Sequence, residues 1–153
     1  MSKSSFFYQL YIRTTPKKLW AALTQAEFTR RYWVETWQVS DWNIGSEWKL
    51  MIPDGRVGDS GKILDIIPEQ RLILAWRNEF QPALKEEGYS QATLELEPQG
   101  DCVKLTVIHE MDREHSAFIE GVSDGWPMIL SSIKSLLETG ESLAQTRHWP
   151  EGM

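Results

Sequence analysis

The chain has 153 residues, of which 41% are apolar and 25% are charged, a length and composition typical of one globular domain. Its net charge of −6 argues against binding to nucleic acids or anionic membranes, and no apolar run approaches the ~20 residues of a membrane span. Cys102 is the only cysteine, which excludes an intrachain disulfide, and the start of the chain is too short and polar for a signal peptide. We therefore expect a cytoplasmic protein.

The first elements are a strand and two short helices. Residues 6–13 alternate, with Tyr8, Leu10 and Ile12 on one face, as in a half-buried strand. The segment TTPKKLWAALT predicts a helix that Thr15 caps and Pro16 opens. Its buried stripe is expected at Leu19, Trp20 and Leu23, and AEFTRRYW predicts a second short helix.

Between residues 34 and 110 the apolar period changes to two. Six segments are predicted as strands: ETWQVSD, EWKLMI, KILDII, RLILAW, ATLELE and VKLTVIHE. Short turns such as PQGD separate them, so the strands form an antiparallel meander. The segment DGRVGDSG predicts a mobile hairpin loop; its glycine spacing does not match a phosphate-binding motif.

After Met111 the pattern is helical again. Apolar residues recur from Val122 to Leu137 on one stripe, and Gly140 is a natural stop. Ser123 or Asp124 is the expected cap, while Pro127 lies either in the first turn or inside a helix that begins upstream. One long helix with a broad apolar face must cover the sheet, which makes the fold α+β. We predict one domain over residues 1–143 and an irregular tail over 144–153.

Strand alternation identifies the inner face of the sheet. His109 ends the apolar series of its strand and is the one ionisable residue expected on that strand's inner face. Two interpretations remain open: a histidine satisfied by hydrogen bonds within the fold, or a polar anchor in an apolar cavity. The segment HEMDREH is not a zinc-protease motif, because Arg113 stands where the second histidine would be.

Several motifs in order resemble the START-like superfamily (SRPBCC, Bet v 1-like), and most closely its branch of activator of heat-shock-protein-ninety ATPase homologues. They are TTPKKLWAALT, NIGSEWKL, GKILDIIPEQRLILAW, VKLTVIHE and GWPMILSSIKSLLETG. The resemblance covers residues 10–143; Ser46 replaces a glycine of the family's pattern. It implies a helix-grip fold, in which a curved antiparallel sheet wraps around the long C-terminal helix and encloses a hydrophobic cavity.

The resemblance implies a binding protein for a small apolar molecule. From alternation and the helical stripe, we expect the cavity to be lined by Trp37, Trp48, Leu50, Leu74, Trp76, Leu94, Val107, His109, Trp126, Ile129 and Ile133. No catalytic residue, metal ligand or cofactor is assigned. The alternatives are a cyclase or isomerase acting on a polyketide- or lipid-like substrate with His109 as acid or base, and a co-chaperone-like interaction module. The aromatic first strand also makes a homodimer an option, and a chaperone partner rests on the resemblance alone.

Overall fold

The computed structural model of the chain describes residues 3–153. Its strands are β1 (Ser4–Ile12), β2 (Trp37–Ser40), β3 (Glu47–Met51), β4 (Val57–Ile67), β5 (Arg71–Asn78), β6 (Ser90–Gln99) and β7 (Cys102–Met111). Its helices are α1 (Pro16–Thr24), α2 (Ala26–Tyr32), α3 (Pro82–Glu86), α4 (Ala117–Thr139) and the 3-10 turn η1 (Ala144–Thr146). Every predicted strand is present, and α3 is an element that the sequence pattern did not reveal.

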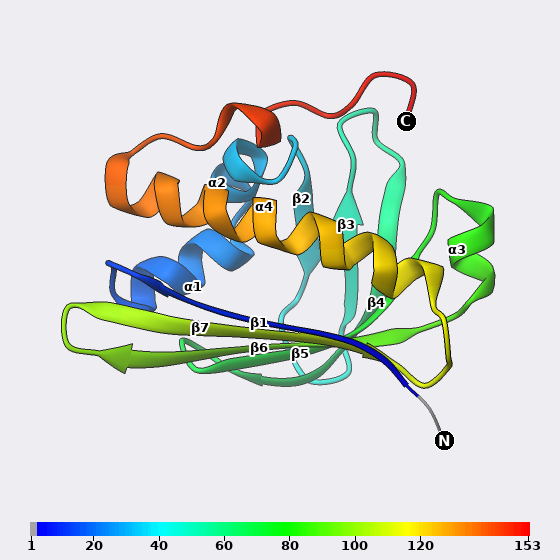
Figure 1. Cartoon of the computed structure of the whole chain (residues 1–153), viewed down its shortest axis with the longest axis horizontal. Coiled ribbons are helices and arrows are strands. Elements are labelled where there is room, and N and C mark those ends of the chain that lie inside the picture. Colours follow the sequence, from blue (N-terminus) through cyan, green and yellow to red (C-terminus); the bar gives the residue numbers. More distant parts are fainter. Residues whose placement is uncertain (1–2) are drawn as a thin grey trace.

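The seven strands form one antiparallel sheet in the order β1-β7-β6-β5-β4-β3-β2. Strands β2 to β7 are a meander, and β1 adds to β7 along its whole length. The sheet curves, and α4 lies across its inner side, with α1 and α2 beside the second half of that helix (Figure 1). The predicted α+β helix-grip fold is confirmed.

Helix α1 forms as its sequence predicts. The side chain of Thr15 accepts a hydrogen bond from the backbone N–H of Lys18, and Pro16 occupies the first turn. Leu19 and Leu23 are buried, whereas Trp20, which was expected in the same stripe, is only partly buried. The difference follows from the helical period, because residue 20 lies about 100° around the helix from Leu19.

Helix α4 begins earlier than predicted. Its cap is Ser116, whose hydroxyl accepts a hydrogen bond from Ile119 N, so the predicted caps Ser123 and Asp124 are wrong. The Glu87 carboxylate also accepts from the first backbone N–H groups of the helix, including Ala117 N at 2.9 Å. These contacts hold two extra turns, in which Phe118, Ile119 and Val122 continue the apolar stripe toward Trp126. Pro127 therefore lies inside the helix, and Gly140 ends it with φ of 88°.

Strand β4 begins at Val57, so most of the segment predicted to be a mobile loop belongs to the sheet. Gly61 is needed there, because a Cβ on it would lie 1.6 Å from the carbonyl oxygen of Ala75 on β5. The early start of β4 brings Asp59 opposite Asn78 in the β4–β5 ladder. Both side chains are buried.

The last residues pack against the domain. Thr146 is buried and shares a 2.6 Å hydrogen bond with Ser132 of α4. The ring of Trp149 meets that of Phe80 edge-on at 5.5 Å, and Arg56 donates to the backbone oxygen of Met153. Residues 144–153 thus cross the open side of the molecule, above the β3–β4 hairpin (Figure 1). Among the helices that the structure describes, none is long and apolar enough to cross a membrane.

Candidate ligand-binding cavity

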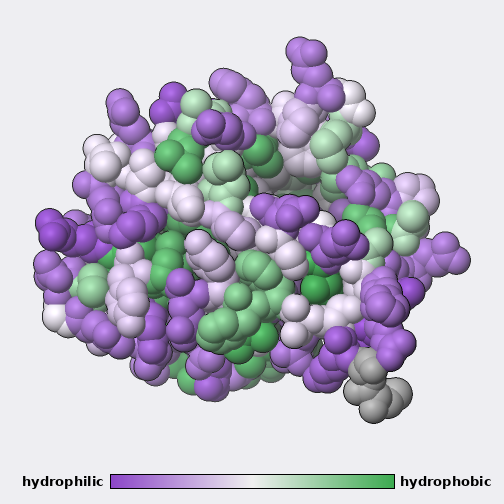
Figure 2. All heavy atoms as spheres, in the orientation of Figure 1, coloured by the Kyte–Doolittle hydropathy of each residue, from purple (hydrophilic) through white to green (hydrophobic). Residues whose placement is uncertain are grey.

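A cavity of about 340 Å³ lies between the first half of α4 and the β3–β4–β5 part of the sheet. In the view of Figure 2, a recess with apolar atoms opens between α4 and the β3–β4 hairpin. Its wall consists of Trp33, Thr36, Leu50, Ile52, Asp59, Trp76, Asn78, Phe80, Gln81, Leu84, Phe118, Gly121, Val122, Gly125, Trp126, Ile129, Trp149 and Met153. Most of these side chains are apolar or aromatic, as in the pockets of small-molecule binding proteins.

Three tryptophans from three elements form the inner wall. The rings of Trp33, Trp76 and Trp126 lie with centroids 5.6 to 6.0 Å apart. The same three side chains line a second void of only about 10 Å³, deeper in the core. The indole cluster therefore separates the cavity from the packed interior. Trp33 was not among the predicted lining residues: it was placed at the end of the predicted second helix, whereas the structure has it just after α2, where its ring meets Trp76 and Trp126.

Two helical glycines leave room at the mouth of the cavity. Gly121 and Gly125 lie four residues apart, so they share one face of α4. A Cβ built on either one meets no atom within 4 Å. In the interior of a helix, glycine costs about 1 kcal/mol relative to alanine. The two glycines thus keep open a space that ordinary helix residues would narrow.

The polar residues of the cavity wall are Thr36, Gln81, Asp59 and Asn78, and the last two lie side by side on adjacent strands. Asp59 of β4 and Asn78 of β5 are each more than 90% buried. Burial raises the pKa of Asp59 to about 7, although the nearby Trp76 N–H and Asn78 amide act in the opposite direction. The indole Nε1 of Trp76 is itself buried and has no hydrogen-bond partner among residues 3–153. The two groups are therefore neighbours at one end of the apolar space: the indole N–H is near enough to lower the pKa of Asp59, yet no direct hydrogen bond joins them.

His109 lies beside this cavity, in a chain of hydrogen bonds that runs from Trp126 through His109 and Ser90 to the backbone of Trp76. Trp126 Nε1 donates to His109 Nδ1 at 3.1 Å, so the ring proton is on Nε2. That nitrogen lies 2.8 Å from Ser90 Oγ, which in turn donates to the carbonyl oxygen of Trp76. Every donor and acceptor on the imidazole has a partner, and the side chain is fully buried.

The surroundings of His109 keep it neutral. Burial lowers the pKa of the imidazole to about 3, because the charged form would lose its hydration. The ring packs against Trp76 and Phe118, with centroids 5.1 and 5.3 Å away. At neutral pH, His109 is therefore a neutral core residue that fixes the orientation of the Trp126 indole.

The structure brings together part of the predicted lining. Leu50, Trp76, Trp126 and Ile129 face the cavity, and Leu74 and Leu94 face the small inner void. Val107, His109 and Ile133 are fully buried in the core beside these spaces. Trp48 is also fully buried and supports the wall from behind, with its ring 4.7 Å from that of Trp76. Period-two alternation identifies the inner face but not which part of that face remains uncovered.

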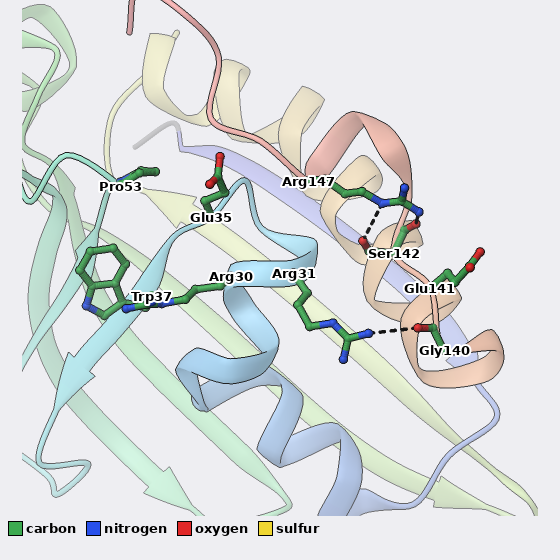
Figure 3. Close-up of a pocket in the computed structure, with 9 residues that line it drawn as sticks. All are labelled: Arg30, Arg31, Glu35, Trp37, Pro53, Gly140, Glu141, Ser142 and Arg147. Carbon is green, nitrogen blue, oxygen red and sulfur yellow. Dashed lines mark hydrogen bonds between the residues drawn. The ribbon is translucent and has the colours of Figure 1, made fainter.

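Trp37 lies elsewhere, in a surface groove of about 660 Å³ between α2 and the segment after α4. Figure 3 shows its ring beside Arg30, whose guanidinium carbon is 4.5 Å from the ring centroid. Arg31 donates to the carbonyl oxygen of Gly140 at the end of α4, and Arg147 donates to that of Ser142. Arg31 thus satisfies a carbonyl at a helix C-terminus, where positive charge is favourable. Two of the three arginines that line the groove are therefore engaged by the backbone at or just after the end of α4.

Within residues 3–153, no group of three or more His, Cys, Asp or Glu side chains is placed to hold a metal ion. The candidate site is accordingly the apolar cavity with its Asp59–Trp76 polar end.

Comparison with known proteins gives one family. The family model described as "Activator of Hsp90 ATPase homolog 1-like protein" matches residues 13–138. No curated protein matches the chain.

Solved structures share the fold at low identity. A protein of Mesorhizobium loti is 23% identical, with a TM-score of 0.74 over 88% of this chain and 96% of its own. The Aha1 dimer from Colwellia psychrerythraea is 19% identical, with a TM-score of 0.72 over 90% and 98% of the two chains. CalU16 from Micromonospora echinospora is 22% identical, with a TM-score of 0.70 over 93% and 78%. At these identities the similarity concerns the fold.

Proposed function

The chain belongs to the family of Activator of Hsp90 ATPase homolog 1-like proteins, and from this premise we propose that it binds a small apolar molecule in the cavity between α4 and the sheet. The observation that carries the proposal is the cavity itself, about 340 Å³ in volume and lined mainly by apolar side chains. Ligand pockets in proteins have volumes of roughly 300–1,000 Å³. The space therefore suits a compact molecule, such as one with two fused rings.

The cavity wall supports binding rather than simple imperfect packing. Cores are normally close-packed, and an empty apolar space costs stability. Here two helical glycines widen the space, and three indoles provide a rigid wall. Aromatic side chains offer large contact areas with little loss of conformational entropy. Both features favour a ligand over a vacant void.

A catalytic role for His109 has less support. Both of its ring nitrogens are engaged by Trp126 and Ser90, and its low pKa makes it a poor base at neutral pH. The runner-up function, a cyclase or isomerase with this residue as acid or base, would require the hydrogen-bond chain to open.

The test is native mass spectrometry of freshly purified protein, followed by organic extraction of any small molecule. The proposal predicts an added mass that is lost under denaturing conditions and an apolar compound in the extract. The proposal is contradicted if the protein is purified without a bound molecule and also binds no apolar probe in a later titration.

Self-association through β1 is a second candidate, favoured by exposed aromatic residues. Phe7 and Tyr11 are on the outer face of this edge strand, with 60% and 51% of their surface exposed. Lys134 donates to the backbone oxygen of Tyr11 and so covers part of the strand's free edge. A second copy would therefore contact the aromatic face rather than extend the sheet. The similar Colwellia protein is described as a dimer.

A further inference from the structure

We propose that the cavity selects an apolar molecule that carries a hydroxyl group, an alcohol or a phenol, and holds this group between the Asp59 carboxyl and the Trp76 indole N–H. The inference rests on the proposed function, because it names the class of ligand for the same cavity. It follows from three observations on the polar end of the cavity.

The first observation is the Trp76 indole N–H, which lies near the Asp59 carboxyl but makes no direct hydrogen bond to it. Trp76 is 96% buried, since only 4% of its surface is exposed, and its Nε1 has no partner in the part of the chain that the structure describes. Buried indole N–H groups usually find an acceptor, because an unpaired one costs about 1–3 kcal/mol. The same indole lines the cavity. An acceptor atom on a ligand would satisfy it.

The second observation is the buried carboxyl. Asp59 lines the cavity with 8% of its surface exposed. Its neighbour across the ladder, Asn78, uses its side-chain oxygen to accept from Gln81 N at 2.8 Å, while its amide N–H group faces Asp59. That amide and the Trp76 N–H offset only part of the cost of burial, because the pKa of Asp59 stays raised. A carboxyl group is rarely placed in an apolar wall unless a partner offsets the cost of removing it from water. In either protonation state, it can exchange a hydrogen bond with a hydroxyl group.

The third observation is the charge around this end of the cavity. The nearby Glu79 is engaged by Arg77, Lys85 and Ser60 outside the cavity lining, so those cations are already paired. Among the residues that line the cavity, none is a lysine, arginine or histidine. A carboxylate ligand would place a second negative charge beside Asp59 without a cation to balance it.

These observations favour a hydroxyl group over other polar groups. An ammonium group donates to Asp59 but has no lone pair for the Trp76 N–H. A hydroxyl oxygen can accept a hydrogen bond from the Trp76 N–H. When Asp59 is ionised, the hydroxyl group also donates a hydrogen bond to its carboxylate; when Asp59 is protonated, the carboxyl group donates to the hydroxyl oxygen. The hydroxyl is neutral and small, so it satisfies both protein groups at the lowest desolvation cost.

The experiment uses three probes with the same naphthalene body. Wild-type protein is titrated by calorimetry with 2-naphthol, 2-methylnaphthalene and 2-naphthoate at pH 7. We expect 2-naphthol to bind about tenfold more tightly than 2-methylnaphthalene, the effect of one good hydrogen bond to a charged or buried partner. We expect 2-naphthoate to bind more weakly than both.

Two variants then remove each polar group separately. Trp76→Phe keeps the aromatic body but lacks the N–H, and Asp59→Leu replaces the carboxyl with an apolar group of similar size. Each variant should bind 2-methylnaphthalene while losing the tenfold preference for 2-naphthol. Trp33→Phe, which removes another indole from the same wall, is the matched control and should keep the preference. Thermal unfolding establishes that each variant is folded. If only one of the two test variants folds, its binding data alone are enough to test the inference.

The outcomes separate this inference from the proposed function. If wild-type protein binds 2-methylnaphthalene as tightly as 2-naphthol, or if both test variants keep the preference, the inference is overturned and the cavity remains an apolar binding site. If 2-naphthoate binds most tightly, the ligand class is an acid and the inference is likewise overturned. If none of the three probes binds wild-type protein, the proposed function itself is contradicted.

Discussion

The indole of Trp126 donates a 3.1 Å hydrogen bond to Nδ1 of His109, joining the long helix to the end of β7. This bond places a bulky aromatic ring at the wall of the cavity and holds it in one orientation. Because His109 is in turn held by Ser90, the position of the helix is coupled to two neighbouring strands. The contact explains why a tryptophan and a strand-end histidine occur together in the sequence.

His109→Ala should destabilise the fold by about 2–4 kcal/mol. The change leaves the Trp126 N–H without an acceptor and creates a void in the core, and each effect costs stability. Urea unfolding measures the loss. His148→Ala is the control, because that side chain is 83% exposed and its removal should change stability by less than about 0.5 kcal/mol. Equal stability of the two variants would show that the hydrogen-bond chain is not structural.

Asp59→Asn should be more stable than wild type, and the difference in the free energy of unfolding should grow as pH rises. In the folded state the pKa of Asp59 is about 7, above its ordinary value of 3.8, so between pH 4 and 7 folding takes up a proton and stability falls as pH rises. The variant lacks this loss. Its advantage over wild type should be small near pH 4 and grow to roughly 4 kcal/mol above pH 7.

His109 has the opposite dependence, which makes the comparison with wild type essential. Its folded pKa of about 3 lies below the ordinary value of 6.5, so its contribution is present above pH 6.5 and is lost as pH falls toward 3. The two slopes oppose each other between pH 4 and 6.5. Urea unfolding of both proteins at pH 4.5, 5.5, 6.5 and 7.5 isolates Asp59 as a difference. A difference that does not change with pH would contradict the raised pKa.

Two glycine substitutions should have effects of opposite sign. Gly61→Ala places a methyl group on the carbonyl oxygen of Ala75, so β4 and β5 must separate, and we expect a loss of at least about 3 kcal/mol. Gly121→Ala meets open space in a helix and should gain about 0.5–1 kcal/mol. Thermal melting distinguishes the two. A stable Gly61→Ala variant would contradict the close approach of the two strands.

Replacing Phe7 by lysine should dissociate a dimer formed through the outer face of β1. The charged side chain would disrupt an apolar contact at its centre, so the sedimentation coefficient should fall to the monomer value. Val39→Lys is the matched control, because Val39 is 50% exposed on the opposite edge strand β2. A wild-type protein that is monomeric at all accessible concentrations would remove this interface.

Local patterns predicted most of the fold. Alternation identified the strands because each has one buried face, and the Thr15–Pro16 pair located the start of α1. The start of α4 was missed although Ser116, a local cap for Ile119 N, stands just before the apolar Phe118 and Ile119. Only the contact with the distant Glu87 is tertiary and therefore absent from any local pattern. Proline at position 127 gave no reliable boundary, since a helix tolerates it when flanking contacts compensate.

The candidate site was harder to predict than the fold. Asp59 was overlooked because its glycine-rich surroundings are typical of a loop, although counting back by twos from the buried Ile63 places residue 59 on the inner face. His109 was correctly placed on that face, but its partners Ser90 and Trp126 lie on other elements. Which part of the inner face remains uncovered depends on how α4, Trp33 and the tail pack together, and alternation carries no information on this.

The central claim, that the cavity binds an apolar molecule, is tested most directly by titrating a neutral dye with two fused rings, such as prodan, into wild-type protein and Gly125→Leu. The leucine fills the cavity from α4, where the glycine leaves open space, and it should strengthen the helix. Asp124→Leu adds the same side chain at an exposed neighbouring position and serves as the control. We predict saturable dye binding with quenching of tryptophan emission in wild type and Asp124→Leu, and at least about tenfold weaker binding in folded Gly125→Leu. Equal binding by all three proteins would place the dye outside the cavity and contradict the account.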